Sequence, residues 1–174
     1  ACAIVDEGTM YGTIKFYKGC LKNNIKPIIG LKVNYIYNDE KDTILLYAMN
    51  EFGYKNLLKI SSRMSLNYGT VDFEYLQKAS LGLLAIIPFT ESMLYKYHLR
   101  TDDIAINSKL DLLRYTYDVL YIGLDIKDTF NDLMFDDASG VEVVKRFKEA
   151  EVDAVIIINT NFGNEELAWN RNSI

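Results

Sequence analysis

Short runs of apolar residues alternate along this chain with segments whose apolar residues recur every three or four positions. A continuous apolar run is typical of a β-strand covered on both faces, and the wider spacing is typical of a helix with one buried face. The runs predict strands over 2–5, 28–37, 43–49, 83–87, 118–124 and 154–158. The spaced segments predict helices over 11–24, 51–64, 72–78, 90–98, 102–113 and 139–149, and a short helix from Asn164.

The spacing also predicts which helix faces are buried. In the helix over 11–24, Ile14, Tyr17 and Leu21 share one face, which we expect to face the core. The inward stripe of the helix over 51–64 is predicted to hold Leu57, Ile60 and Met64, widened by Phe52 and Leu58. Tyr11, Phe16 and Tyr17 could stack nucleobases, but core and rim packing is the favoured interpretation of their helical spacing.

Strands that alternate with helices, most of them continuously apolar, indicate an α/β fold with a largely parallel sheet. A barrel and a doubly wound sheet both fit this order. No GxGxxG or GxxxxGK[ST] follows a strand, so the nucleotide-binding form of the fold is disfavoured. Without an internal repeat or a linker-like stretch, residues 1–174 are predicted to form a single domain.

Charge and cysteine content narrow the expected partners. The chain has 19 basic and 24 acidic residues and no Lys/Arg-rich run, so we expect no direct contact with nucleic acid, although a local basic patch stays open. Two cysteines form neither a disulfide framework nor a zinc site, which favours the reducing cytoplasm. No apolar run approaches the roughly 20 residues that span a bilayer, so we expect no membrane partner. The chain opens inside a strand pattern, so we expect a fragment.

Two segments carry a more specific signal. Residues 3–33 read AIVDEGTMYGTIKFYKGCLKNNIKPIIGLKV, and residues 45–62 read LLYAMNEFGYKNLLKISS. They resemble the PHP (polymerase and histidinol phosphatase) domain of bacterial DNA polymerase III alpha subunits, of the Gram-positive or mollicute type. The family patterns are approximately A-I-T-D-H-G-x-M-Y-G-x-x-x-F-Y-x-x-C-x-x-x-x-I-K-P-I-I-G-x-E and L-L-A-x-N-x-x-G-Y-x-N-L-x-x-L-S-S. Beyond Ser62 only the order of strands and helices agrees.

The resemblance implies a distorted (β/α)7 barrel whose first strand is missing from this fragment. It implies membership in a replicative polymerase, with the polymerase core of the same chain as the main partner and a proofreading subunit as a further one. The polymerase regions themselves are not in this chain. The strand over 2–5 would then have an unpaired edge.

In metal-binding members of the family, His, Asp, Glu and Cys ligands at the strand ends hold up to three metals for phosphoester hydrolysis. On matching positions here, the Asp-His pair becomes Asp6 and Glu7, and the glutamate after P-I-I-G-x becomes Lys32. Strand ends expected to carry ligands read Pro88-Phe89-Thr90, Gly123 and Thr160-Asn161-Phe162, and the single histidine, His98, is expected within a helix away from any strand end.

A lysine in such a site would repel a divalent cation, and one Asp with one Glu cannot build a catalytic metal centre. We therefore expect a non-catalytic, structural PHP domain without a resident cofactor. Asp6 and Glu7 are the remnant metal positions, open to weak Zn, Mn or Mg binding, although solvated turn residues are the simpler interpretation. The carboxylates Asp125, Asp128 and Asp132 match no calcium loop.

Two alternatives remain at this point. One is a degenerate but active metal-dependent phosphoesterase or 3′–5′ proofreading exonuclease, which would need histidines before Ala1. The other is a free-standing adaptor of the same fold.

Overall fold

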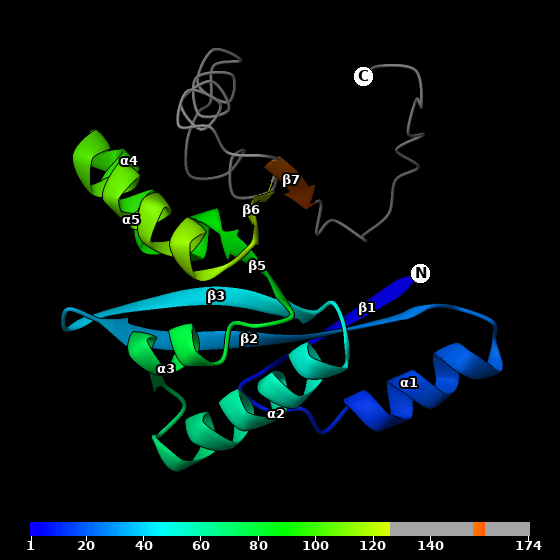
Figure 1. Ribbon diagram of the computed structural model, residues 1–174. Coiled ribbons are helices and arrows are strands. Elements are labelled where there is room, and N and C mark those ends of the chain that lie inside the picture. The colour runs from blue at the N-terminus through cyan, green and yellow to red at the C-terminus, as the bar shows by residue number, and fades with distance from the viewer. Residues whose placement is uncertain (126–154, 159–174) are drawn as a thin grey trace, which may run out of the picture.

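The computed structural model describes residues 1–125 and 155–158, which form a mixed α/β structure (Figure 1). The elements run in the order β1 (Cys2–Glu7), α1 (Thr13–Lys22), β2 (Pro27–Tyr37), β3 (Glu40–Ala48), α2 (Glu51–Leu66), β4 (Val71–Asp72), α3 (Phe73–Lys78), β5 (Leu83–Pro88), η1 (Phe89–Glu91), α4 (Met93–Leu99), α5 (Asp103–Thr116), β6 (Val119–Asp125) and β7 (Val155–Ile158). The predicted strands are confirmed, with β4 as a short addition. The predicted helices over 139–149 and from Asn164, and the positions Asp128, Asp132 and 160–162, lie outside the described residues.

The sheet is largely parallel, as predicted, with one reversed strand. Its order is β1-β2-β3-β5-β6-β7, and β4 pairs with β2. β3 runs antiparallel to both of its neighbours, β2 and β5, while the other pairings are parallel. β1 and β7 each pair with one neighbour, so the described part of the sheet is open at both sides. An α/β fold is therefore confirmed, whereas closure into a barrel is not.

The reversal of β3 has a local cause in the turn before it. Asn38 and Asp39 both have positive φ, 50° and 63°, which is the conformation of a two-residue hairpin loop. Asparagine and aspartate tolerate this left-handed backbone better than other residues with a side chain. A tight turn of this kind can only join antiparallel strands, so β3 pairs directly back onto β2.

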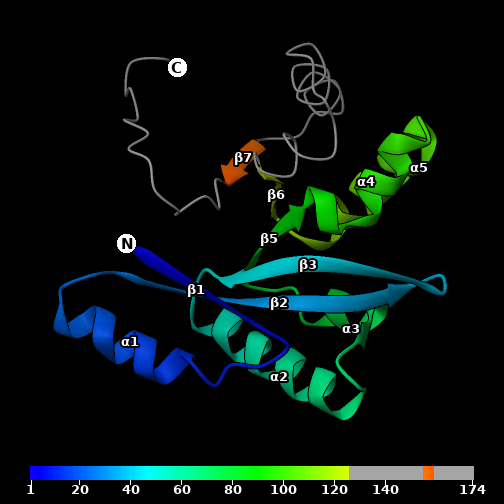
Figure 2. The ribbon, with the colours of Figure 1, turned by 180° about the vertical axis from the view of Figure 1, so that it is seen from behind.

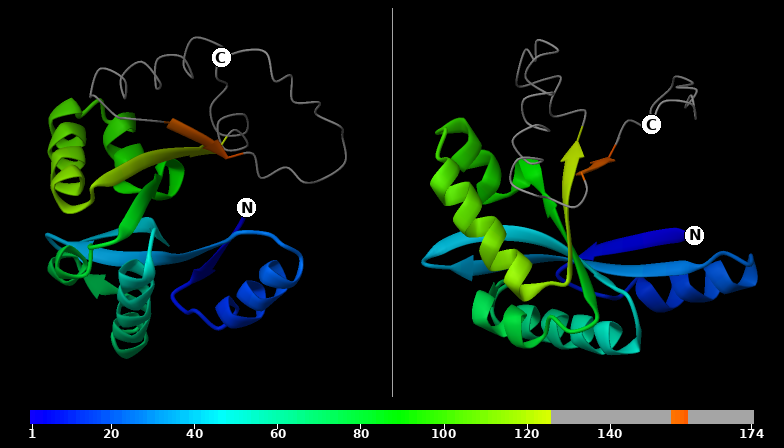
Figure 3. Two further views of the ribbon diagram at one scale, coloured as in Figure 1. Left: turned by 45° about the vertical axis from the view of Figure 1, so that its right-hand side comes forward. Right: turned by 45° about the horizontal axis from the view of Figure 1, so that its top comes forward.

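The helices surround the sheet unevenly. α1, α2 and α3 lie below β2 and β3 in Figure 1, whereas α4 and α5 lie above, beside β5 and β6, and the view from behind agrees (Figure 2). β5 and β6 rise away from the plane of β2 and β3 (Figure 3). In residues 1–125 and 155–158, every helix falls short of the length and apolarity that crossing a membrane requires.

A single hydrophobic cluster joins the inner positions of the sheet to the helices. From β2 and β3 it takes alternate residues such as Leu31 and Leu46, as the two-residue period of a strand requires. From α2 it takes Leu57, Ile60 and Met64, which confirms the predicted stripe. Full burial of each such side chain stabilises the fold by about 1.5–3 kcal/mol. The predicted widening of the stripe is wrong, because Phe52 and Leu58 are exposed on the other side of α2.

The predicted inner face of α1 is also wrong. Ile14, Tyr17 and Leu21 are exposed, and the residues directed inward are Thr13, Phe16 and Cys20. Both sets follow helical spacing, so the apolar period alone cannot choose between them. The expected core or rim packing holds for Phe16, whereas Tyr11 is 91% exposed.

β1 differs from its prediction as a strand covered on both faces. It pairs with β2 alone among the described strands, and its residues are exposed or half-buried. Cys2 at the start of this strand is exposed, whereas Cys20 on α1 is buried. The partial exposure of β1 follows from its place at an open side of the described sheet, where one edge lacks a strand partner among these residues.

The residues of the motif over 45–62 form one joint between α2 and the start of β5. The Asn50 side chain caps α2 by accepting a hydrogen bond from the Gly53 N–H at 3.0 Å. A Cβ on Gly53 would lie 2.0 Å from the Gly82 carbonyl oxygen, so only glycine fits at this point. The Asn56 amide donates to the Leu81 carbonyl at 3.0 Å. The motif is thus explained by close backbone packing.

Candidate functional site

The carboxyl edge of the sheet is the end at which the parallel strands β1, β5 and β6 finish. Glu7 ends beside Lys32 of β2, and Pro88 of β5 ends beside Gly123 of β6. In a parallel α/β sheet, side chains and loops at this edge can converge from several strands. The edge therefore brings together positions that are far apart in the sequence. The described residues that match metal-ligand positions of the family pattern lie here.

Asp6 and Glu7 are adjacent on β1, but they project to opposite faces because side chains alternate along a strand. Asp6 pairs in register with Leu31, on the core side, and Glu7 pairs with Lys32 on the other face. The carboxylate of Asp6 accepts a hydrogen bond from the Gly12 N–H at 3.0 Å, which holds the loop into α1. The structure therefore does not bring the two carboxylates together around one point.

Lys32 lies between acidic side chains at the carboxyl edge of the sheet. Its ammonium nitrogen lies 2.5 Å from Oε2 of Glu91, which follows β5. The hydrogen bond to Glu91 raises the pKa of Lys32 above its usual value; partial burial opposes this, and Glu7 adds to it. The ammonium is therefore held as a cation beside carboxylates from two elements.

Of the other described strand-end positions, Pro88 and Phe89 are apolar, Gly123 lacks a side chain, and Thr90 alone has a polar side chain. Phe89, directly after β5, is buried and packs edge-on against Tyr95 and His98. His98 lies in α4, as predicted, but its ring centroid is 5.7 Å from that of Phe89. The expectation that it lies away from any strand end is therefore wrong, because helix α4 packs onto η1, which directly follows β5.

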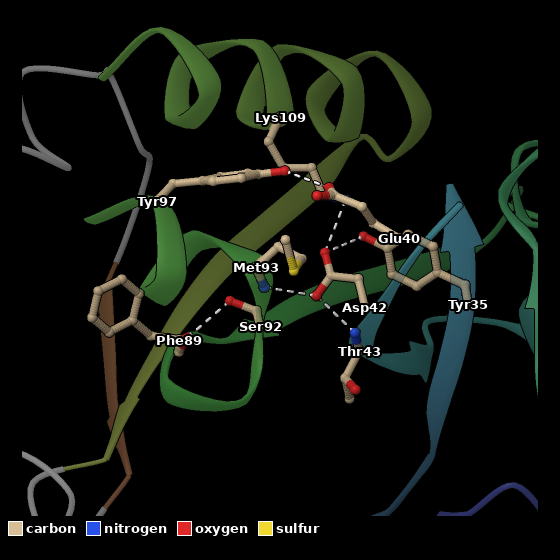
Figure 4. A network of polar contacts seen from close by, with 9 residues as sticks. All are labelled: Tyr35, Glu40, Asp42, Thr43, Phe89, Ser92, Met93, Tyr97 and Lys109. Carbon is tan, nitrogen blue, oxygen red and sulfur yellow. Dashed lines mark hydrogen bonds and ion pairs between the residues drawn. The ribbon is translucent and has the colours of Figure 1, made fainter. Parts of the chain in front are cut away.

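The strongest polar cluster of the described residues lies elsewhere, around buried Asp42 of β3 (Figure 4). One oxygen of Asp42 lies 2.9 Å from the Lys109 ammonium and accepts the Tyr35 hydroxyl at 2.9 Å. The other oxygen accepts the backbone N–H groups of Thr43 and Met93, at 2.8 and 3.0 Å. Each oxygen therefore has two donors, and this carboxylate has no lone pair directed at an open site.

The residues around Asp42 form a connected layer between the β2–β3 hairpin and helices α4 and α5. The Lys109 ammonium also lies over the rings of Tyr35 and Tyr37, at 4.9 and 5.6 Å from their centroids. At the outer side, the Tyr97 hydroxyl donates to Glu40 at 2.8 Å. A buried ion pair with satisfied hydrogen bonds fixes one arrangement of the elements that it joins. We therefore interpret the cluster as a structural latch.

Tyrosines near this latch are held in their neutral form. Burial is the largest cause that raises the pKa of Tyr35, and the neighbouring Asp42 adds to it. Burial, followed by the hydrogen bond to Glu40, raises the pKa of Tyr97 to about 12. Burial also raises the pKa of Tyr117, whose hydroxyl has no hydrogen-bond partner in the described part of the chain.

The latch is absent from the sequence prediction, although the sequence contains a signal for it. Asp42 lies at an inward-facing position of β3, on the same face as buried Ile44 and Leu46. Lys109 occupies the inward phase of α5, beside buried Ile106 and Leu110. An acid and a base at two core positions indicate a buried pair, because either charge alone is costly to bury.

Comparison with known protein families matches residues 1–132 to the PHP domain. The chain belongs to the PHP domain family. This confirms the resemblance carried by the segments over 3–33 and 45–62.

Several curated proteins named DNA polymerase III subunit alpha are similar to this PHP domain. The one from Streptococcus pyogenes is 40% identical over 86 residues, that from Bacillus subtilis 40% over 90, and that from Staphylococcus aureus 42% over 89. Each alignment covers 49% of this chain and 8% of the relative. This chain therefore spans only a small part of the length of the relatives that it matches.

The chemistry available at the carboxyl edge of this PHP domain follows from its charges. In residues 1–125 and 155–158, no group of three or more His, Cys, Asp or Glu side chains is placed to hold a metal ion. Lys32 supplies a positive charge at the position where the family pattern has a carboxylate. This arrangement favours an ion pair between elements.

Proposed function

We propose that this PHP domain is a non-catalytic, structural module of a replicative DNA polymerase III alpha subunit, in which it supports the polymerase core during DNA replication. The observation that carries the proposal is the ion pair of Lys32 with Glu91 at the carboxyl edge. A fixed ammonium repels a divalent cation and engages a carboxylate that could otherwise be its ligand. The names of the similar proteins support the link to replication.

We further propose that the complete domain is a distorted (β/α)7 barrel. In such a barrel the open sides of β1 and β7 are covered by further pairing, which removes both exposed edges. The predominance of parallel pairs and the order of the strands support this arrangement. The polymerase core of the same polypeptide is the proposed main partner, and a proofreading subunit is a second one.

The cytoplasm is the proposed compartment, and the two unpaired cysteines, Cys2 and Cys20, are consistent with its reducing conditions. Asp6 and Glu7 stay predicted remnant positions of a metal site. Their projection to opposite faces supports weak binding of Zn, Mn or Mg at most.

The test uses the natural full-length protein. Elemental analysis of the purified protein measures bound Zn and Mn, and degradation of a 3′-end-labelled primer in manganese measures exonuclease activity. We expect no stoichiometric metal in this domain, and we expect any primer degradation to be unchanged in the Asp6→Asn/Glu7→Gln double variant. Glu74→Gln, which changes an exposed carboxylate of α3, is the matched control.

Stoichiometric metal together with degradation that the double variant abolishes and Glu74→Gln preserves would establish the phosphoesterase or exonuclease alternative instead. A natural polypeptide that lacks polymerase sequence would favour a free-standing adaptor. The mass of the intact natural protein decides this second question separately.

A further inference from the structure

The outer face of α1 is unusually apolar for a solvent-exposed helix surface. Ile14, Tyr17 and Leu21, one helical turn apart, are 64%, 47% and 53% exposed. The inner face of the same helix already supplies Phe16 and Cys20 to the interior. A helix that covers the core with one face needs no second apolar stripe, so the outer stripe indicates an interaction surface.

This stripe borders a groove of about 800 Å3 at the amino end of the sheet. The groove lies between α1, the start of β2, the end of β3 and the first turn of α2. Its apolar lining includes Ile14, Tyr17, Pro27, Ile28, Tyr47 and Met49. A groove of this size and composition can take the apolar side chains of a protein segment.

Positive charge lies on the side of the groove that α1 and the start of β2 form. Residues 8–38 contain five lysines and no aspartate or glutamate, although the whole chain has a net charge of −5. Lys18 and Lys26 line the groove, and Lys15 and Lys22 lie on exposed turns of α1. No carboxylate of the described residues pairs with these four lysines, whereas Glu51, the one acidic residue of the lining, is paired with Lys55 at 2.7 Å.

From these observations we infer that the groove and the outer stripe of α1 are a docking site for an acidic amphipathic segment of the same polypeptide, from outside residues 1–174. The apolar side chains of that segment fill the groove, and its carboxylates face the lysines. The inference rests on the proposed function, in which this chain is part of a polymerase subunit.

Two observations select this occupant. The matching regions make up only 8% of the related alpha subunits, so in a protein of that kind most of the polypeptide is available to cover the groove. The lining is dominated by aliphatic and aromatic side chains with cations at the rim, which complements carboxylates beside apolar residues. A nucleic acid would bring phosphates to the rim, but it has no aliphatic side chains to fill the interior.

The experiment places a photoreactive phenylalanine analogue at Tyr17 in the natural full-length protein and maps its cross-links by mass spectrometry. The control is the same replacement at Tyr68, a fully exposed tyrosine after α2 that does not line the groove. We expect Tyr17 to cross-link within the same polypeptide to a segment rich in Asp or Glu, and Tyr68 not to reach that segment. Replacing Lys15, Lys18 and Lys22 by Glu should lower the yield about tenfold.

Cross-links from Tyr17 to DNA, to a second copy, to another protein or only within residues 1–174 would overturn the inference, as would a yield equal to that at Tyr68 or unaffected by the charge reversal. The intact mass of the natural protein distinguishes a failure of this inference from a failure of the proposed function. A polymerase-length polypeptide without the cross-link refutes the docking site alone, whereas a polypeptide that ends near Ile174 refutes both.

Discussion

At the scale of single residues, the Asp42–Lys109 ion pair is far more buried than the Lys32–Glu91 and Glu51–Lys55 pairs. Lys109→Met removes the cation but leaves Asp42 buried with two backbone donors and one phenol. We expect the free energy of unfolding to fall by about 3–5 kcal/mol, because an uncompensated buried charge is left behind. Chemical denaturation measures this directly.

The matched control is Lys55→Met, which breaks the exposed pair with Glu51 on α2. This change should leave the free energy of unfolding nearly unchanged, since water screens the exposed pair. The double variant Asp42→Asn/Lys109→Met should recover part of the lost stability. Equal effects of Lys109→Met and Lys55→Met would show that the buried pair is not a latch.

A second prediction at this scale concerns the sign of the charge at Lys32. Lys32→Glu would place a third carboxylate beside Glu7 and Glu91, where a cation now lies. Hard divalent cations bind to converging carboxylates, so we expect the variant to bind Mn2+ more tightly than the natural protein does. Isothermal titration calorimetry measures the gain.

Lys41→Glu, on the exposed β2–β3 hairpin, has the same change of charge and serves as the control. If Lys41→Glu and Lys32→Glu bind Mn2+ equally, the effect is one of net charge, and Lys32 has no particular role at the carboxyl edge.

At the scale of elements, the joint between α2 and β5 depends on the contact of two glycine backbones. Gly53→Ala would drive a methyl group into the Gly82 carbonyl, 2.0 Å away. We expect a loss of about 1–3 kcal/mol in unfolding free energy, as for other overpacked sites. Gly19→Ala on α1 is the control, because nothing lies within 4 Å of its Cβ position. That change should instead stabilise the protein by about 0.5–1 kcal/mol, since alanine is the better helix former. Similar signs for the two variants would refute the close contact.

The elements themselves could be predicted from the sequence, but the orientation of α1 could not. The stripe of α2 was identified because only one of its faces is strongly apolar, with Leu57, Ile60 and Met64 at core spacing. α1 has apolar residues on two faces, and the choice between them depends on contacts with β2 that no local pattern encodes. The lysines of α1 did not change the prediction. Ile14 and Tyr17 match helical spacing as well as the residues on the inner face do, so the spacing gave no reason to prefer the other face.

At the scale of the whole molecule, buried tyrosines link stability to alkaline pH. An unfolded tyrosine loses its proton near 10.0, whereas Tyr97 in the folded protein keeps it to about 12, and the pKa values of Tyr35 and Tyr117 are raised as well. Above 10.0 the unfolded state therefore binds fewer protons than the folded state, so stability is full below that pH and falls as the pH rises towards 12.

Denaturation at a series of alkaline pH values, with tyrosinate absorbance as a second readout, measures this loss. Tyr97→Phe should make the loss of stability with pH less steep, whereas Tyr115→Phe, at an exposed position on α5, should not. A slope that both substitutions change equally would show that burial of Tyr97 is not the cause.

The fold class and family could also be predicted at this scale, because the segments over 3–33 and 45–62 hold residues whose roles are local, such as the cap at Asn50 and the close contact at Gly53. The long-range features could not be derived in the same way. The ion pair of Asp42 with Lys109 joins residues 67 positions apart in the sequence. The ion pair of Lys32 with Glu91 depends on how β5 is placed relative to β2.

The strand directions have a consequence for how this domain can change over evolution. Lys32 lies five residues along β2 from Pro27 of the groove, about 16 Å at the usual rise of a strand. Substitutions separated by such distances and sharing no partner have nearly additive effects. The two ends of the sheet can therefore diverge independently: a lineage can replace ligands at the carboxyl edge one by one while the amino end keeps its own surface under selection.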